Sequence, residues 1–224
     1  MFKRDYLLKQ IEQLTVVLHR ILFQKKFVDI EDAQRQLDEA SRHVLGLNLR
    51  SLRSLSTKDI LELLTYQGQI DTAKALVIHD LFVGQGDFIK DNVEKEEAYW
   101  AYVKALELLL LLGLTDEVEP DDEVMLEIKP RLEGLHERLQ GWRLPAETQK
   151  WLLPYYDKMG SYAKAEDALF HYIEDHPEDR TMPERGAQFY EKLLDIDEER
   201  LTAGNFSREE ALEGLKLMQS KLQG

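Results

Sequence analysis

The chain has 224 residues, of which 43% are hydrophobic and 32% are charged, a balance typical of a folded globular protein and not of a disordered one. The absence of cysteine excludes disulfides, thiolate nucleophiles and cysteine-ligated zinc or iron–sulfur sites. A formal net charge of −14 argues against nucleic-acid binding, because neutralising phosphates requires clustered Lys and Arg.

The charge is unevenly distributed along the chain. Residues 1–60 contain 11 Lys or Arg and 8 Asp or Glu, so this part carries a net charge of +3. The remaining residues carry 18 basic and 35 acidic side chains, which gives −17. The asymmetry favours association of the two parts or a basic partner, while the simpler interpretation is that an acidic surface keeps the protein in solution.

The N-terminal part, residues 1–55, is predicted to form a helical hairpin. Five apolar residues of its first helix recur at steps of four and three: Leu7, Ile11, Leu14, Leu18 and Ile21. This spacing is typical of an amphipathic helix and of a short heptad seam, so residues 4–26 are a candidate surface for homodimer formation. A second helix is predicted near residues 28–46, with Asp29 as its N-cap and Gly46 after its end.

Neither a signal peptide nor a membrane span is expected. Polar residues interrupt the start of the chain before an apolar stretch of the kind found in signal peptides can form. The longest apolar run, Leu106–Leu114, is too short to cross a bilayer. We therefore expect a cytoplasmic protein with no membrane partner.

Residues 56–224 are predicted to be a body of successive helices. Their expected ranges are 56–68, 69–82, 93–113, 124–141, 146–160, 161–177, 183–204 and a last helix from Ser207. Gly84 and Gly86 are expected to break the chain, Pro130 to kink or restart a helix, and Ser207 to form a capping box with Glu210. No segment shows the alternation of a β-strand, so the predicted fold is all-α, with about ten helices stacked as hairpins in one continuous domain.

Glycines predicted to end helices recur at similar intervals. They stand at positions 68, 113, 160 and 204, which are 45, 47 and 44 residues apart. A period of this length is typical of stacked helical pairs. Because the chain has 12 glycines, chance placement remains an alternative explanation.

One segment matches the spacing of a known helical repeat. The matching residues are Leu152, Tyr156, Gly160, Tyr162, Ala165, Leu169 and Pro177. A shorter match consists of Ile60, Leu64, Gly68, Ile70, Ala73 and Val77. The pattern resembles the tetratricopeptide repeat, which implies an α-α superhelix; the copies lie 92 residues apart, no multiple of 34, so the repeats would be irregular. Over its whole length, above all at residues 6–22, the chain is also similar to a bacterial family of unknown function, which implies no activity.

No motif in the sequence names a reaction. His171, Glu174 and His176 are the best metal candidates, but they lack the pair of histidines four residues apart that faces one side of a helix. The acidic segment 116–123 lacks the ligand spacing of an EF-hand, and "VGQGDF" lacks the Lys of a phosphate-binding loop. We therefore assign no catalytic, cofactor-binding or metal-binding residue.

Aromatic side chains are the best candidates for binding. Trp and Tyr are enriched at interfaces, and Tyr99, Trp100, Trp151 and Tyr155 are the candidate partner-binding residues, with Trp151 and Tyr155 preferred for an exposed face. The competing interpretation places such rings in the core of the hairpins. The leading hypothesis is a non-enzymatic interaction or scaffold module for a protein or peptide partner or a second copy of the chain. The alternative is an all-helical enzyme or small-ligand-binding protein with a site between hairpins.

Overall fold

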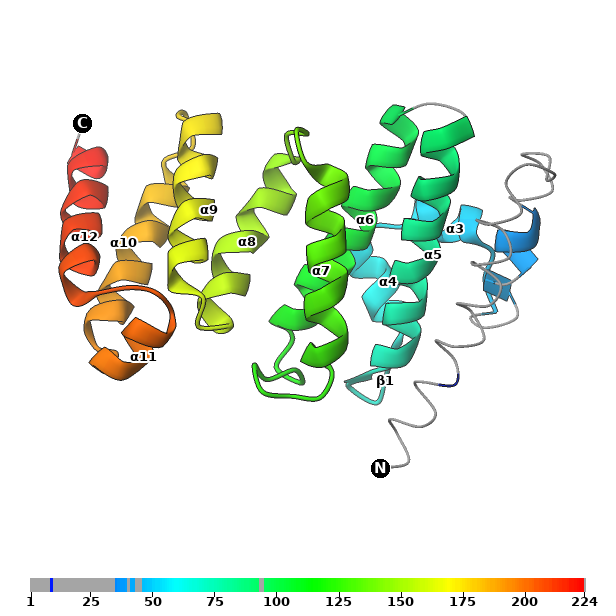
Figure 1. Cartoon of the computed structure of the whole chain (residues 1–224), viewed down its shortest axis with the longest axis horizontal. Helices are drawn as coiled ribbons and strands as arrows, with labels where there is room; N and C mark the ends of the chain where they lie inside the picture. The colour runs from blue at the N-terminus through cyan, green and yellow to red at the C-terminus, as the bar shows by residue number, and fades with distance from the viewer. Residues whose placement is uncertain (1–8, 10–34, 40, 43–45, 93–94, 224) are drawn as a thin grey trace. The chain divides into compact units, whose positions relative to one another are not determined.

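A computed structural model describes residues 9, 35–39, 41–42, 46–92 and 95–223 (Figure 1). The described residues are mainly helical, as the sequence predicts. The chain divides into two compact units, Met1–Trp142 and Arg143–Gly224. The proposed seam at residues 4–26 and most of the predicted N-terminal hairpin lie outside the described residues, and the domain boundary after residue 55 stays a prediction.

The first unit is built around one buried helix. Its elements are α3 (Leu49–Ser54), α4 (Thr57–Leu63), β1 (Thr65–Tyr66), β2 (Gln69–Ile70), α5 (Thr72–Asn92), α6 (Lys95–Leu114) and α7 (Met125–Leu139). Helix α6 packs against α4, α5 and α7, and Figure 1 shows α5, α6 and α7 side by side. Helix α6 carries apolar side chains on nearly all of its faces. Such a helix is stable only when neighbouring elements cover it.

A short β-hairpin replaces the predicted end of the helix over 56–68. The helix α4 ends at Leu63, and β1 pairs antiparallel with β2, Thr65 opposite Ile70. The two turn residues, Gln67 and Gly68, have φ angles of 53° and 77°. Positive φ at both central positions is typical of a two-residue hairpin turn, so Gly68 belongs to this turn and does not end a helix. The expectation of no β-structure was therefore wrong at this point.

Helix α5 continues through both glycines that were expected to break it. Gly84 and Gly86 are buried inside the helix, which ends only at Asn92. A Cβ atom on Gly86 would lie 2.5 Å from Cε1 of Tyr102 on α6. Glycine thus allows a close approach of two helices here, which offsets its low helix propensity of about 1 kcal/mol relative to alanine.

The second unit contains five helices. They are α8 (Ala146–Lys158), α9 (Tyr162–Asp175), α10 (Thr181–Leu194), α11 (Glu198–Ala203) and α12 (Arg208–Gln223). Helix α9 packs on α8 and α10, and α10 packs on α12 (Figure 1). The predicted single helix over 183–204 is divided in two, because Asp197 caps a new helix by accepting a hydrogen bond from Arg200 N.

The repeat-like segment contributes to the core of the second unit. Tyr162, Ala165 and Leu169 are buried in the core of the second unit. Gly160 follows α8 with a φ of 66°, the left-handed conformation that commonly ends helices. The capping box of the last helix is also present, since Ser207 Oγ accepts from Glu210 N at 3.2 Å and Ser207 N donates to Glu210 Oε2 at 2.8 Å.

Candidate functional site

An exposed aromatic cluster lies at the start of α6 and after the end of α7. We name Tyr99, Trp100 and Trp142 the tryptophan patch. The Tyr99 ring stacks on Trp142 with centroids 4.9 Å apart and meets Trp100 edge to face at 5.0 Å. Trp100 is 59% exposed and Trp142 is 41% exposed, whereas Tyr99 is buried. One buried tyrosine therefore supports two indole rings whose faces reach the solvent.

Two carboxylates lie beside Trp100, one turn nearer the start of α6. Glu96 and Glu97 are exposed and lie four and three positions before Trp100, so all three side chains share one face of α6. Lys95 lies five positions before Trp100, about 140° around the helix and away from this face. An indole beside two carboxylates fits a cationic group, which is attracted both to the aromatic ring and to the negative charges.

The other two aromatic candidates lie in the second unit. Trp151 is half-buried, and Tyr155 is only 2% exposed, so the preference for Tyr155 on an exposed face was wrong. Its ring meets that of Tyr156 at 5.5 Å, and burial raises the pKa of both phenols. Tyr155 follows the buried Thr148 by two helical turns and thus shares its buried face.

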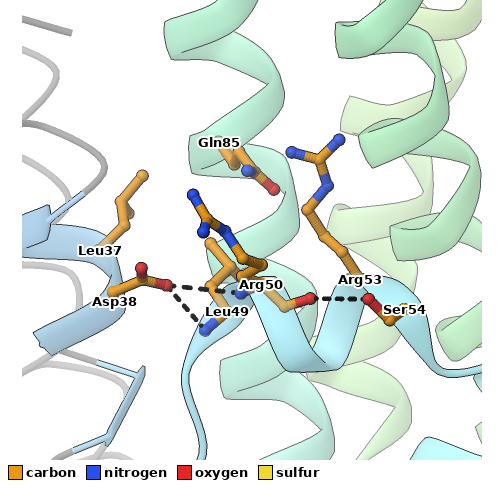
Figure 2. Close-up of a pocket in the computed structure, with 7 residues that line it drawn as sticks. All are labelled: Leu37, Asp38, Leu49, Arg50, Arg53, Ser54 and Gln85. Atoms are coloured by element: carbon orange, nitrogen blue, oxygen red, sulfur yellow. Dashed lines mark hydrogen bonds between the residues drawn. The ribbon is translucent and has the colours of Figure 1, made fainter. Parts of the chain in front are cut away.

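A pocket of about 340 Å³ lies in the first unit, between α3, α5 and the segment that contains Leu37 (Figure 2). Its described lining residues are Leu37, Asp38, Leu49, Arg50, Arg53, Ser54 and Gln85. Gln85 is 4% exposed, and nothing in the described part of the chain donates to its Oε1. A buried acceptor without a donor lowers the free energy of unfolding by about 1–3 kcal/mol, so a molecule that donates to this atom would stabilise the folded protein.

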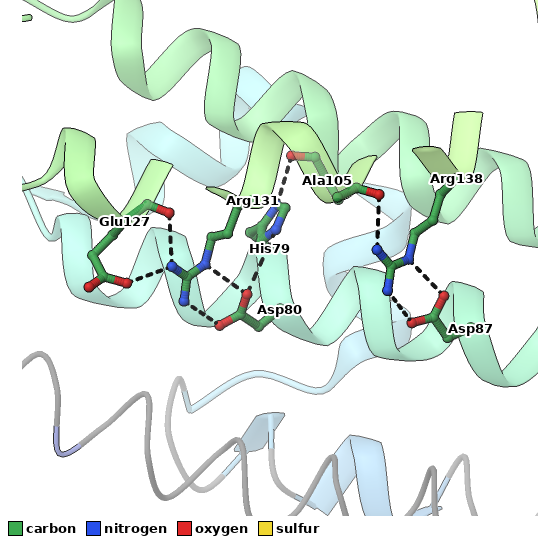
Figure 3. A network of polar contacts seen from close by, with 8 residues as sticks. His79, Asp80, Asp87, Ala105, Glu127, Arg131 and Arg138 are labelled. Atoms are coloured by element: carbon green, nitrogen blue, oxygen red, sulfur yellow. Dashed lines mark hydrogen bonds and ion pairs between the residues drawn. The ribbon is translucent and has the colours of Figure 1, made fainter. Parts of the chain in front are cut away.

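Two arginine–aspartate pairs join α5 and α7 (Figure 3). Arg131 donates to both oxygens of Asp80 at 2.9 Å, and Arg138 donates to those of Asp87 at 2.9 and 2.8 Å. Glu127 also accepts from Arg131 at 2.7 Å. Such paired hydrogen bonds fix the orientation of both groups. With every one of these carboxylates bonded to an arginine, the network is structural.

His79 lies next to this network and is kept neutral by burial. Its Nδ1 lies 3.2 Å from Ala105 O, and its Nε2 lies 3.7 Å from Asp80 Oδ1. Burial lowers the pKa of His79 to about 4, although Asp80 acts in the opposite direction. The ring is only 2% exposed, so a substrate in solvent has no route to it without local opening.

Both histidines that the sequence offered as metal ligands lie near acceptor groups of the second unit, although His176 Nε2 is buried without a hydrogen-bond partner among the residues described. His171 Nδ1 lies 2.8 Å from Asp167 O, and His176 Nδ1 lies 3.8 Å from Glu178 Oε1. In the acidic loop, Glu117 accepts from Ile70 N at 3.0 Å and thereby holds the β-hairpin. Within the described ranges, no three Asp, Glu or His side chains are arranged to hold a metal ion. A search of the described helices for one long and apolar enough to span a bilayer also finds none.

The fold and the patch together define a mainly helical protein with two compact units and an acidic aromatic surface. The chain belongs to the family described as "Family of unknown function (DUF6483)", whose model matches residues 1–223. This membership agrees with the expected similarity to an uncharacterised family. Neither the curated proteins nor the solved structures include a match to the chain.

Proposed function

We propose that the protein is a non-enzymatic interaction module and that the tryptophan patch binds a basic segment of a partner protein. The observation that carries the proposal is the pair of partly exposed indoles, Trp100 and Trp142, held by one buried tyrosine. Residues that dominate binding energy are most often Trp, Tyr and Arg, and they gain most when a rigid support holds them in place.

The charge of the surface supports a basic partner over an acidic one. Glu96 and Glu97 lie beside Trp100, and the chain after residue 60 carries −17. An arginine of the partner can stack on an indole while its guanidinium pairs with a carboxylate. Complementary charge of this kind raises the rate of association and discriminates against acidic proteins.

Within this proposal, the helical hairpins form a scaffold of the tetratricopeptide-like kind in a bacterial cytoplasm. The resemblance of residues 152–177 to that repeat and the burial of Tyr162, Ala165 and Leu169 support it. The scaffold supplies a rigid surface and no chemistry of its own.

Binding through the patch is tested by comparing three forms of the full chain in cross-linking pull-downs from the native host. We expect Trp100→Ala/Trp142→Ala to lose partners that the unchanged protein recovers. The control Leu212→Ala/Leu217→Ala, which removes two exposed apolar side chains from α12, should keep them. Truncating an anchoring tryptophan typically costs at least about 2 kcal/mol, or about thirtyfold in affinity.

The chemistry of the partner is tested with Glu96→Gln/Glu97→Gln. We expect weaker recovery and cross-links from the first turn of α6 to a Lys- or Arg-rich segment of the partner. Three outcomes would overturn the proposal: identical partners for the tryptophan variant, cross-links to an acidic segment, or recovery of further copies of the chain alone.

A further inference from the structure

The pocket between α3 and α5 contains polar groups that no part of the proposed function uses. Arg50 and Arg53 lie three positions apart on α3, and Figure 2 shows both guanidinium groups on the same side of the helix, toward Gln85 of α5. The hydrogen bonds that Arg50 and Arg53 make within the described part of the chain involve their backbone atoms. Two like charges at this spacing repel each other unless an anion lies between them.

The local charge around the two arginines is positive within an acidic protein. The nearby Asp38 is used by the backbone, since its Oδ1 accepts from Leu49 N at 3.0 Å and from Arg50 N at 3.4 Å. The Lys104 ammonium donates to the carbonyls of Arg53 and Leu55. Its pKa is lowered, mainly by burial and in part by the charge of Arg53, against the influence of Glu107. Besides the two arginines, the described lining of the pocket contains one charged residue, Asp38.

Gln85 is an independent observation that points to a ligand. It is a buried side chain on the pocket wall, and its Oε1 requires a hydrogen-bond donor that the described residues do not supply. The arginines offer only donors and require an acceptor. A single ligand satisfies both requirements if it carries a negative charge and, next to it, an O–H or N–H group. The buried side chains of Leu37 and Leu49 add an apolar wall.

We propose that this pocket binds a small organic anion, a carboxylate or a phosphate, that carries a hydrogen-bond donor next to its charge. The negative group lies between Arg50 and Arg53, and its donor faces Gln85 Oε1. A volume of about 340 Å³ is at the lower end of pockets that hold small molecules. The site is distinct from the tryptophan patch, and its test is independent of the partner protein.

Comparing inorganic phosphate with sulfate separates recognition of the negative charge by the arginines from recognition of the donor by Gln85 Oε1. Both anions present oxygens to arginine, but at neutral pH phosphate keeps at least one P–O–H donor and sulfate has none. The full chain, labelled with ¹⁵N, is titrated with each anion while the side-chain N–H signals of Arg50, Arg53 and Gln85 are followed by NMR. We expect saturable binding of phosphate at least about tenfold tighter than that of sulfate, the effect of one hydrogen bond to a charged site.

A second pair of probes, glycolate and acetate, identifies the class of anion. Glycolate carries a hydroxyl next to its carboxylate, and acetate does not. Tighter binding of glycolate than of phosphate assigns the site to hydroxy acids, and the reverse order assigns it to phosphates. Both orders support the proposal, provided that the probe with the donor binds better than the probe without it.

Two variants test the residues themselves. Arg50→Gln/Arg53→Gln changes exposed side chains and should weaken phosphate binding at least about tenfold, while the control Arg180→Gln/Arg185→Gln, with the same change of charge in the second unit, should not. Gln85→Met should reduce the preference for phosphate over sulfate to about equality. The proposal is overturned if the wild type binds sulfate as well as phosphate, if it shows no saturable binding, or if the double arginine variant binds unchanged.

Discussion

Two helix pairs, one in each unit, are held together by different chemistry. In the first unit, α5 and α7 are joined by charged pairs, Asp80 with Arg131 and Asp87 with Arg138. In the second unit, α10 and α12 meet where the Tyr190 ring lies over Gly214, and a Cβ atom there would be 2.3 Å from the ring. Helices can thus be packed through charged pairs or through the close approach of an aromatic ring to a glycine.

The largest effect is expected from breaking one charged pair. Arg131→Met leaves Asp80, which is 21% exposed, without its cation and should lower the free energy of unfolding by about 3 kcal/mol or more. Replacing both residues, as Asp80→Leu/Arg131→Met, should recover over half of that loss, because the less exposed carboxylate is removed together with its cation. The Glu127 carboxylate, which also loses Arg131, is 30% exposed and is better solvated. Hydrogen exchange of α5 and α7 peptides together with urea unfolding measures both effects.

The exposed Arg185 on α10 supplies the control for this experiment. Arg185→Met should change stability by no more than about 0.5 kcal/mol. If Arg131→Met also changed the free energy of unfolding by no more than about 0.5 kcal/mol, the charged pairs would contribute little to stability. The contrast between the two helix pairs would then disappear.

Adding volume at the contact between Tyr190 and Gly214 should lower the free energy of unfolding nearly as much as Arg131→Met does. Gly214→Ala places a methyl group where the Tyr190 ring lies and should cost about 3 kcal/mol. The neighbouring Glu213→Ala, on the exposed face of α12, should be close to neutral. Exchange protection of α10 and α12 peptides reports the loss, and equal protection in the two variants would contradict the close contact.

Acid should destabilise the first unit through His79. The pKa of its ring is about 4 in the folded protein against an ordinary value of 6.5, so the unfolded chain binds a proton that the folded chain does not between these values. Stability is therefore complete above about pH 6.5 and is lost as the pH falls toward 4, by about 2 kcal/mol at pH 5. Urea unfolding at pH 7 and pH 5 measures this loss.

The variant His79→Gln isolates the contribution of this ring. It should remove about 2 kcal/mol of the difference between pH 7 and pH 5, because no imidazole remains to be protonated. The exposed His136→Gln on α7 should keep the full difference. An unchanged pH dependence in His79→Gln would assign the acid sensitivity to other groups.

The smallest effect should be the same in both units, because both use the same helix cap. Ser56 with Asp59 begins α4, and Ser207 with Glu210 begins α12. Ser56→Ala and Ser207→Ala should each cost about 1 kcal/mol in thermal or urea unfolding. Ser220→Ala, within α12 and exposed, should cost nothing, since alanine favours a helix interior. Losses that differ strongly between the two caps would show that tertiary contacts determine their contribution.

Local rules predicted much of the fold but little of the candidate site. Helix α9 follows from apolar periodicity, and helix α6 follows from a long stretch of apolar residues with high helix propensity. The cap at Ser207 follows from its spacing to Glu210. The continuity of α5 through Gly86 could not be predicted, because it depends on Tyr102, a residue of another helix. Tertiary contact of this kind overrides local propensity.

The site depends on contacts between distant residues in the same way. Trp100 was predicted as a binding residue from its residue type, but Trp142 was not, because its contact with Tyr99 spans α6 and α7. The charged pairs have one signature in the sequence, an equal spacing of the residues on the two helices. Asp80 and Asp87 are seven residues apart, as are Arg131 and Arg138, so both pairs are 51 residues apart.

This equal spacing sets the register between α5 and α7. Seven residues correspond to about two turns, so the helices run parallel and carry matching charges about 10 Å apart. If α7 slid along α5 by two turns, one arginine would still meet an aspartate, but one charge on each helix would lose its partner. Only one alignment satisfies Asp80, Asp87, Arg131 and Arg138 together. The two pairs therefore disfavour shifted alignments of α5 and α7, because each such alignment leaves charges unpaired. An apolar contact alone would not distinguish between these alignments.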